Sequence, residues 1–214
     1  MEMEMEMEME TQTLQRVKTY DGVLRSLHLI VGLAILVLIL TGSAVDYFAH
    51  GVARDTIWQL HIYAGYSLIL GFLARIVWGL VGPRHARWSD LWHPKAWMAA
   101  VRQRKPHAAP RIGHHALASA AYLAVYGVLL VMAVTGLTLA AVAQSTGPLF
   151  VWLGSAAWLE DIVKQPHELG YYFLIGFTLL HIFMLIWHEI RERLPLAQSM
   201  VSGYQYLPAQ RDDK

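Results

Sequence analysis

Residues 167–181 read His-Glu-Leu-Gly-Tyr-Tyr-Phe-Leu-Ile-Gly-Phe-Thr-Leu-Leu-His, an apolar run with a histidine at each end. The run belongs to one of four long apolar stretches, at about 27–48, 57–81, 116–142 and 167–187. About 20 helical residues cross the hydrocarbon core of a bilayer, so each stretch is long enough to span it. Helices are expected because lipid cannot pair with exposed backbone groups, and the alternating pattern of barrel strands does not occur. The sequence therefore predicts an all-α membrane protein, a four-helix transmembrane bundle.

The composition excludes several kinds of site. The 214-residue chain is 56% hydrophobic and 15% charged, whereas soluble domains are about a quarter charged. Because it has no cysteine, disulfides, thiolate metal sites, cysteine-ligated iron–sulfur clusters and covalently attached haem are excluded. Its 11 histidines are the obvious nitrogen ligands for any metal or haem. Eight tryptophans and ten tyrosines suit two membrane interfaces, and the lipid bilayer is the first expected partner.

The two ends of the chain are predicted to be tails. Residues 1–15 form a disordered acidic tail, because residues 1–10 alternate methionine and glutamate without a packable face. This tail is not expected to be a signal peptide, since it lacks a basic segment and the apolar run that follows is too long. Residues 16–206 form one domain, and residues 207–214 form a second flexible tail.

Lysine and arginine are concentrated in alternate loops. They occur before the first helix, between the second and third, and after the fourth: Arg16, Lys18, Arg25, Arg84, Arg87, Lys95, Arg102, Arg104, Lys105, Arg111, Arg191, Arg193, Arg211 and Lys214. The other two loops carry Arg54 and Lys164. Basic loops stay in the cytoplasm, so both termini and the middle loop are predicted to be cytoplasmic.

The middle loop, residues 82–113, contains tryptophans between its basic residues. This pattern predicts a short helix in the membrane interface, although an ordinary connector has the same composition. On the opposite side, residues 144–165 are predicted to form a partly ordered loop.

Four histidines lie within or at the ends of the apolar stretches, at two matched depths. His28 lies near the inner end of the first helix, and His61 near the outer end of the second. His167 begins the fourth helix on the outside, and His181 follows 14 residues later, about 21 Å deeper and within about 40° of the same face. The depths pair His28 with His181 and His61 with His167. Each pair would hold one haem iron from both sides, which favours electron transfer over oxygen binding.

Other residues fit the same spacing. Arg75 lies 14 residues after the second-helix histidine, at the inner level, where a haem propionate would be a natural partner. Gly42, Gly32 and Gly65 follow candidate ligands by 14 or four residues and would leave room for a macrocycle. Arg25 lies near the inner interface, where haem propionates would be within its reach. The alternatives are hydrogen bonding between helices for the histidines, packing for the glycines, and extension of Arg75 to the interface.

Surface roles are expected for the remaining histidines and for two carboxylates near the outer interface. These residues are His50, His85, His93, His107, His114, His115, His188, Asp46 and Glu168. The less expected alternative for His114 and His115, which open the third helix, is contact with a propionate or a quinone. For Asp46 and Glu168 it is a hydrogen bond to a ligand imidazole, or proton transfer.

Several short motifs occur in a familiar order. They are Arg25-Ser-Leu-His28, His61 with Gly65, Arg75-Ile-Val-Trp78-Gly79, His167-Glu168, His181 and Gly203-Tyr204. Over residues 17–206 the chain resembles the bacterial cytochrome b561 and nickel-hydrogenase cytochrome b family. The resemblance implies a four-helix plasma-membrane cytochrome with two haem b groups, and the ligand positions of the family fall on the same four histidines. The acidic tail matches no feature of the family.

The resemblance also implies partners. Members commonly pass electrons from a periplasmic partner, such as a hydrogenase or a c-type cytochrome, to quinone, and some resemble superoxide-oxidising cytochromes. Transmembrane electron transfer, with possible quinone oxidoreductase activity, is the expected function. One alternative is a membrane anchor that docks a redox enzyme through residues 144–165. Another is a haem-free transporter, which the lack of paired broken helices argues against. No nucleic-acid partner is expected.

Overall fold

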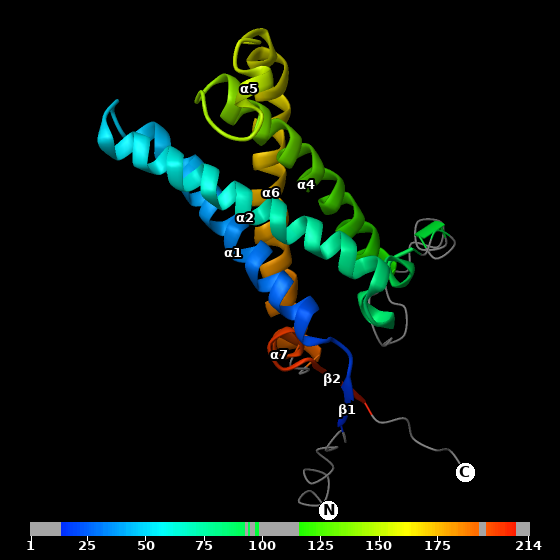
Figure 1. The fold of residues 1–214 in the computed structure, drawn as a ribbon. Helices are drawn as coiled ribbons and strands as arrows, with labels where there is room; N and C mark the ends of the chain where they lie inside the picture. Colours follow the sequence, from blue (N-terminus) through cyan, green and yellow to red (C-terminus); the bar gives the residue numbers. More distant parts are fainter. Residues whose placement is uncertain (1–13, 93, 95–96, 99–115, 193–195, 209–214) are drawn as a thin grey trace, which may run out of the picture.

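Four long helices dominate the computed structural model, which describes residues 14–92, 94, 97–98, 116–192 and 196–208. They are α1 (Gly22–Ala44), α2 (Val52–Val81), α4 (Ala116–Val142) and α6 (Trp158–Glu192) (Figure 1). Each is long and apolar enough to cross a membrane. The predicted fold class, a four-helix all-α membrane bundle, is therefore confirmed.

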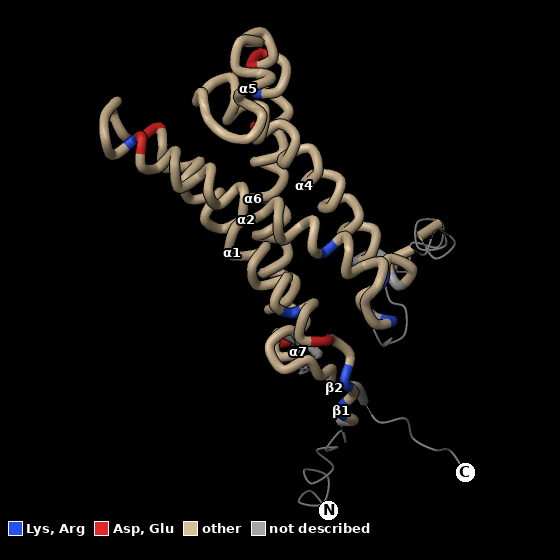
Figure 2. Tube along the Cα trace, in the orientation of Figure 1, with Lys and Arg blue, Asp and Glu red and all other residues tan. Residues whose placement is uncertain are grey.

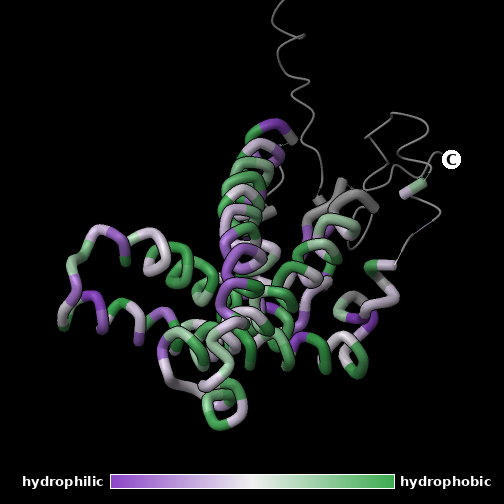
Figure 3. Tube along the Cα trace, turned by 90° about the horizontal axis from the view of Figure 1, so that it is seen from above, coloured by the Kyte–Doolittle hydropathy of each residue, from purple (hydrophilic) through white to green (hydrophobic). Residues whose placement is uncertain are grey.

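Most of the apolar surface of these helices faces outward. In the most hydrophobic window of each helix, only 17% of α1, 33% of α2, 33% of α4 and 11% of α6 is buried within the protein. Charged residues lie mainly toward the ends of the bundle (Figure 2), and hydrophobic residues recur along the helices (Figure 3). Exposed apolar area of this extent is unfavourable in water. The bilayer is the solvent that removes this cost.

The bundle is built from two antiparallel helix pairs. Contacts are most extensive between α1 and α2 and between α4 and α6, with fewer between α2 and α4 or α1 and α6. A side chain on Gly71 would come within 2.9 Å of Val31, and one on Gly170 within 2.4 Å of Met132. Glycine thus allows the close approach of both pairs. A core of small and large apolar residues joins them: Ala34, Leu68, Phe72, Val125, Leu129 and Leu174.

Two helices begin before the apolar stretches that predicted them, at polar residues that favour a helix start. The Asp21 carboxylate accepts a hydrogen bond from the Leu24 amide at 3.0 Å and so caps α1. Helix α6 begins at Trp158, ahead of the position near 167 expected from the sequence, and continues through Pro166. Glu160 and Asp161 occupy its first turn, where negative charge interacts favourably with the helix dipole. The helix therefore projects past the apolar stretch.

A small sheet, which the sequence did not predict, ties the ends of the domain together. Strand β1 (Leu14–Lys18) pairs antiparallel with β2 (Tyr204–Pro208), which follows the short helix α7 (Leu196–Ser202). The Arg16 guanidinium lies 3.6 Å from the centre of the Tyr204 ring, a cation–π contact. Residues 14–15 and 207–208, which were expected to belong to tails, are part of this sheet. Both ends of the domain therefore lie at the same end of the bundle (Figure 1).

The three segments that connect the long helices contain short helices. The 3-10 turns η1 (Val45–Tyr47), η2 (Arg84–Ala86) and η3 (Trp88–Asp90) follow α1 and α2, and α5 (Phe150–Leu153) lies between α4 and α6. The Trp88 indole donates a hydrogen bond to the Ile76 carbonyl at 3.2 Å, which folds the start of the middle loop onto α2. The predicted interfacial helix falls mostly on residues 93–115, nearly all of which lie outside the described residues.

Candidate functional site

The structure brings the four transmembrane histidines together in two pairs. His28 of α1 faces His181 of α6, with ring centroids 6.3 Å apart and ring planes at 86°. His61 of α2 faces His167 of α6, with centroids 6.5 Å apart and planes at 67°. Helix α6 thus supplies one member of each pair, and the pairs lie at two levels because 14 residues of one helix separate them.

The ring separations fit a metal held between two imidazoles. Metal–imidazole bonds are about 2 Å long, and each ring centroid lies roughly 1 Å behind its nitrogen, so ligands on opposite sides of one metal have centroids about 6 Å apart. Among the described residues, no group of three or more histidine, aspartate or glutamate side chains would hold a bare ion. Two ligands per site therefore suit a metal that brings its own in-plane ligands, as haem iron does.

Two threonines that sequence reasoning missed contact the pair formed by His61 and His167, called the outer pair after its predicted side, as His28 and His181 are called the inner pair. The hydroxyl oxygen of Thr41, on α1, lies 2.9 Å from Nδ1 of His61. The hydroxyl oxygen of Thr135, on α4, lies 2.9 Å from Nδ1 of His167. Both threonine side chains are buried. A signal was present in the sequence, because each threonine begins a Thr-Gly dipeptide at the outer end of a helix.

The glycines of these dipeptides lie against the same histidines. A Cβ atom on Gly42 would come within 3.6 Å of Cε1 of His61, and one on Gly136 within 3.3 Å of Cε1 of His167. Gly42 was expected at the outer level, whereas Gly136 was missed. A Cβ atom on Gly32 or Gly65 would meet nothing within 4 Å. These two positions therefore border open space, where a flat group would have room.

Arg75 is buried among aromatic rings. Its side chain is 7% exposed, and its guanidinium carbon lies 4.9 Å from the ring centre of Trp88 and 5.7 Å from that of Tyr126. Its Nη1 is buried without a hydrogen-bond partner. A buried cation with an unpaired donor is costly, so this atom fits an anionic group such as a propionate. The burial of Arg75 argues against the alternative reading, in which its side chain extends to the membrane interface.

Arg25 has a different environment from Arg75. Its Nη1 donates a hydrogen bond to the Val201 carbonyl, and its Nε lies near Gly203 at the end of α7. That Nε is also buried without a partner. Arg25 therefore ties α1 to the C-terminal segment and keeps one donor available.

The other residues considered from sequence are exposed or half-buried, or have side chains outside the described part of the chain. Asp46 forms an ion pair with Arg54 at 3.5 Å, and His50 and Glu168 are exposed. His188 is half-buried near the end of α6. The side chains of the remaining five histidines are not among those described: His85, His93, His107, His114 and His115.

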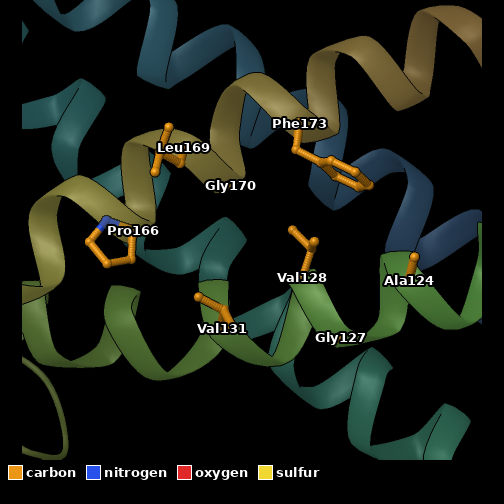
Figure 4. A pocket seen from close by; sticks show the side chains of 8 residues that line it. All are labelled: Ala124, Gly127, Val128, Val131, Pro166, Leu169, Gly170 and Phe173. Atoms are coloured by element: carbon orange, nitrogen blue, oxygen red, sulfur yellow. The ribbon is translucent and has the colours of Figure 1, made fainter.

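A groove of about 410 Å³ lies between α4 and α6 (Figure 4). Its lining is apolar and contains no titratable side chain: Ala124, Gly127, Val128, Val131, Pro166, Leu169, Gly170 and Phe173. The groove lacks the ligands of a redox centre, and the histidine pairs remain the candidate site.

Comparison with known proteins gives a consistent family. The family described as prokaryotic cytochrome b561 matches residues 19–203. A protein of Azotobacter chroococcum, named a probable Ni/Fe-hydrogenase B-type cytochrome subunit, is 29% identical over 92% of this chain and 91% of its own length. Proteins with the same name from Bradyrhizobium diazoefficiens and Cupriavidus necator are 28% and 25% identical, over 87% and 91% of this chain and 85% and 88% of their own lengths. No solved structure matches significantly. The chain therefore belongs to the prokaryotic cytochrome b561 family, as a membrane b-type cytochrome of electron transfer.

Proposed function

We propose that the protein transfers electrons across the membrane through two b-type haems, each held by two histidines. The observation that carries the proposal is the placement of two imidazole pairs, with centroids 6.3 Å and 6.5 Å apart, at two levels of one helix. His28 and His181 would hold the inner haem, and His61 and His167 the outer haem. When bound, each haem supplies a one-electron redox centre.

The surrounding residues have complementary tasks. Two histidines for each haem would leave its iron no open site for oxygen. Arg75 would hold an inner propionate through its unpaired Nη1, and Arg25 would offer its unpaired Nε. Gly32 and Gly65, which border open space, would leave room for the macrocycles, whereas Gly42 borders His61 and Tyr171. The helices around them exclude water and provide a low dielectric, in which these fixed charges set the potentials.

The direction of the protein in the membrane follows from its charges. The sheet places both ends of the domain on one side, together with the basic residues Arg16 and Lys18. Basic segments remain on the cytoplasmic side of the bacterial plasma membrane. Both termini and the inner pair would thus be cytoplasmic, and the outer pair periplasmic.

The names of the relatives suggest the electron donor. Several relatives are named as probable Ni/Fe-hydrogenase cytochrome subunits, so a hydrogenase at the periplasmic face is the proposed donor, with a c-type cytochrome as the other candidate. Quinone is the proposed acceptor. A role limited to anchoring such an enzyme remains a second candidate, while membership in a b-type cytochrome family argues against a haem-free transporter.

The full-length protein, purified in detergent, is expected to contain two haems per chain. A pyridine haemochrome assay against protein concentration measures this number, and a redox titration is expected to resolve two one-electron steps. The two sites differ in their hydrogen bonds and nearby charges, so their potentials should differ. A preparation saturated with haem at one per chain would contradict the dihaem proposal.

The periplasmic segment offers a test of the docking surface. The side chains of Val151, Trp152, Trp158 and Ile162 are 86%, 74%, 64% and 58% exposed, and exposed apolar side chains of this kind suit a protein partner. Replacing Trp152 and Trp158 by serine is expected to reduce co-purification of the partner enzyme at least tenfold. Aromatic side chains that become buried in a complex contribute much of its binding energy. The haem content should stay at the wild-type value.

The matched control for the docking test is replacement of Tyr63 and Leu70 by serine. These side chains are also exposed, at 64% and 68%, but they lie well inside the spanning helix α2, whereas Trp152 precedes α6 and Trp158 is its first residue. Equal loss of the partner in both variants, or full retention in the Trp152 and Trp158 variant, would contradict docking at this segment.

A further inference from the structure

The two threonines at the outer histidine pair form the same arrangement twice. Thr41 reaches from α1 to His61 on α2, within the first helix pair. Thr135 reaches from α4 to His167 on α6, within the second. In each case the threonine oxygen is 2.9 Å from Nδ1 of the histidine. The outer pair is therefore held from both sides by hydroxyl groups of the two neighbouring helices.

The hydroxyl hydrogen of each threonine already has an acceptor. The Thr41 hydroxyl donates to the Val37 carbonyl at 2.7 Å, and the Thr135 hydroxyl donates to the Val131 carbonyl at 2.7 Å. A hydroxyl has a single hydrogen to donate but two lone pairs that accept. With the hydrogen on the helix carbonyl, the threonine oxygen accepts a hydrogen bond from Nδ1–H of the histidine.

This hydrogen bond determines the tautomer of the ring. A neutral imidazole carries one hydrogen, so a hydrogen on Nδ1 leaves Nε2 with its lone pair. The nitrogen that is free to bind a metal is then Nε2, on the far side of the ring from the threonine. Metal-binding histidines generally depend on such an acceptor to orient the ring and raise its basicity.

The inner pair has a different environment. His181 stacks on Phe177, with centroids 5.8 Å apart and planes at 15°, an apolar contact. The hydroxyl contacts of the outer pair involve both of its members, and Gly42 and Gly136, next to the threonines, bring α1 and α4 close to the same rings. The two levels thus differ in how their ligands are held.

We propose that Thr41 and Thr135 are positioning residues, which fix the Nδ1–H tautomer and the ring orientation of His61 and His167 and thereby lower the potential of the outer haem alone. The inference rests on the proposed function, since it assigns these histidines as haem ligands. A hydrogen bond accepted from Nδ1–H increases electron donation from the ring to the iron. Greater donation stabilises the oxidised form, so removing the acceptor should raise the midpoint potential.

The test replaces each threonine by valine and, separately, by serine, in the full-length protein. Valine has nearly the same shape but no hydroxyl, while serine keeps the hydroxyl. Thr138→Val is the matched control, because Thr138 is also buried on α4 and its hydroxyl donates to the Val134 carbonyl at 2.9 Å. Redox titrations and the low-spin ferric signals in electron paramagnetic resonance are measured for every variant.

The valine variants are expected to favour reduction of one haem by about tenfold, equivalent to about 59 mV for a one-electron couple. Thr41→Val and Thr135→Val should shift the same midpoint upward and change the same resonance signal. The serine variants and Thr138→Val should keep the wild-type values. Loss of the outer haem in a valine variant, with recovery in the serine variant, would also support the proposal.

Three outcomes would overturn the inference. They are unchanged potentials in both valine variants, an equal shift of both haems, or the same shift in Thr138→Val. These failures are distinct from failure of the proposed function, which would show itself in the wild-type protein as fewer than two haems per chain. A wild-type protein with two haems and insensitive threonines would keep the function and reject the positioning role.

Discussion

Replacing His167 by alanine is expected to remove one of the two haems and leave the other in place. The variant loses one of the two imidazoles of the outer pair, whose centroids lie 6.5 Å apart, and alanine offers no nitrogen in its place. His61→Ala is expected to lose the same haem. The haemochrome assay should give about half the wild-type haem per chain for each variant, and the redox titration should lose the same step.

Double variants make the pairing quantitative. Replacing His61 and His167 together should remove no more haem than either change alone, because both residues hold one group. Replacing His28 and His167 together should remove both haems, because they belong to different pairs. His50→Ala is the control, since this histidine is exposed beyond the end of α1 and should keep the full haem content. Loss of different redox steps in His61→Ala and His167→Ala would refute the pairing.

Replacing Arg75 by glutamine is expected to lower the midpoint potential of the inner haem. A cation near a haem favours the reduced form, which carries one positive charge fewer, so its removal favours the oxidised form. The side chain is buried, and charge interactions are strong where water is excluded. A shift of about 60 mV downward, or about 1.4 kcal/mol for one electron, is the expected order of magnitude. Redox titration measures it.

Arg75→Lys is the matched control for the role of charge. Lysine keeps the positive charge but loses the planar group that stacks near Trp88 and Tyr126. The midpoint potential of the inner haem in Arg75→Lys should stay close to the wild-type value. The haem content of both variants is measured beside it, so that loss of haem is not mistaken for a shift in potential. An unchanged midpoint in Arg75→Gln would contradict a contact between this cation and a propionate. A shift confined to the outer haem would contradict the assignment of Arg75 to the inner haem.

Local patterns explain how much of this fold was accessible from sequence. The four apolar runs predicted four spanning helices because hydropathy over about 20 residues is a property of consecutive positions. Helix ends were less accessible. The expected start of the fourth helix followed Pro166, but α6 passes through this residue and begins at Trp158. Asp21 caps α1 and marks its start in the sequence, but the prediction followed hydropathy and began the helix several residues later.

The same distinction applies to the site. Depth along a helix follows from residue spacing at a fixed rise, so the sequence by itself determined four spans and two levels of histidines. Only the tertiary structure decided that Thr41 and Thr135 meet the outer histidines, that Gly136 lies beside His167, and that Arg75 is enclosed by Trp88 and Tyr126. These contacts depend on the rotation and offset of one helix against another, which arise from packing between distant segments and not from the periodicity of any single segment.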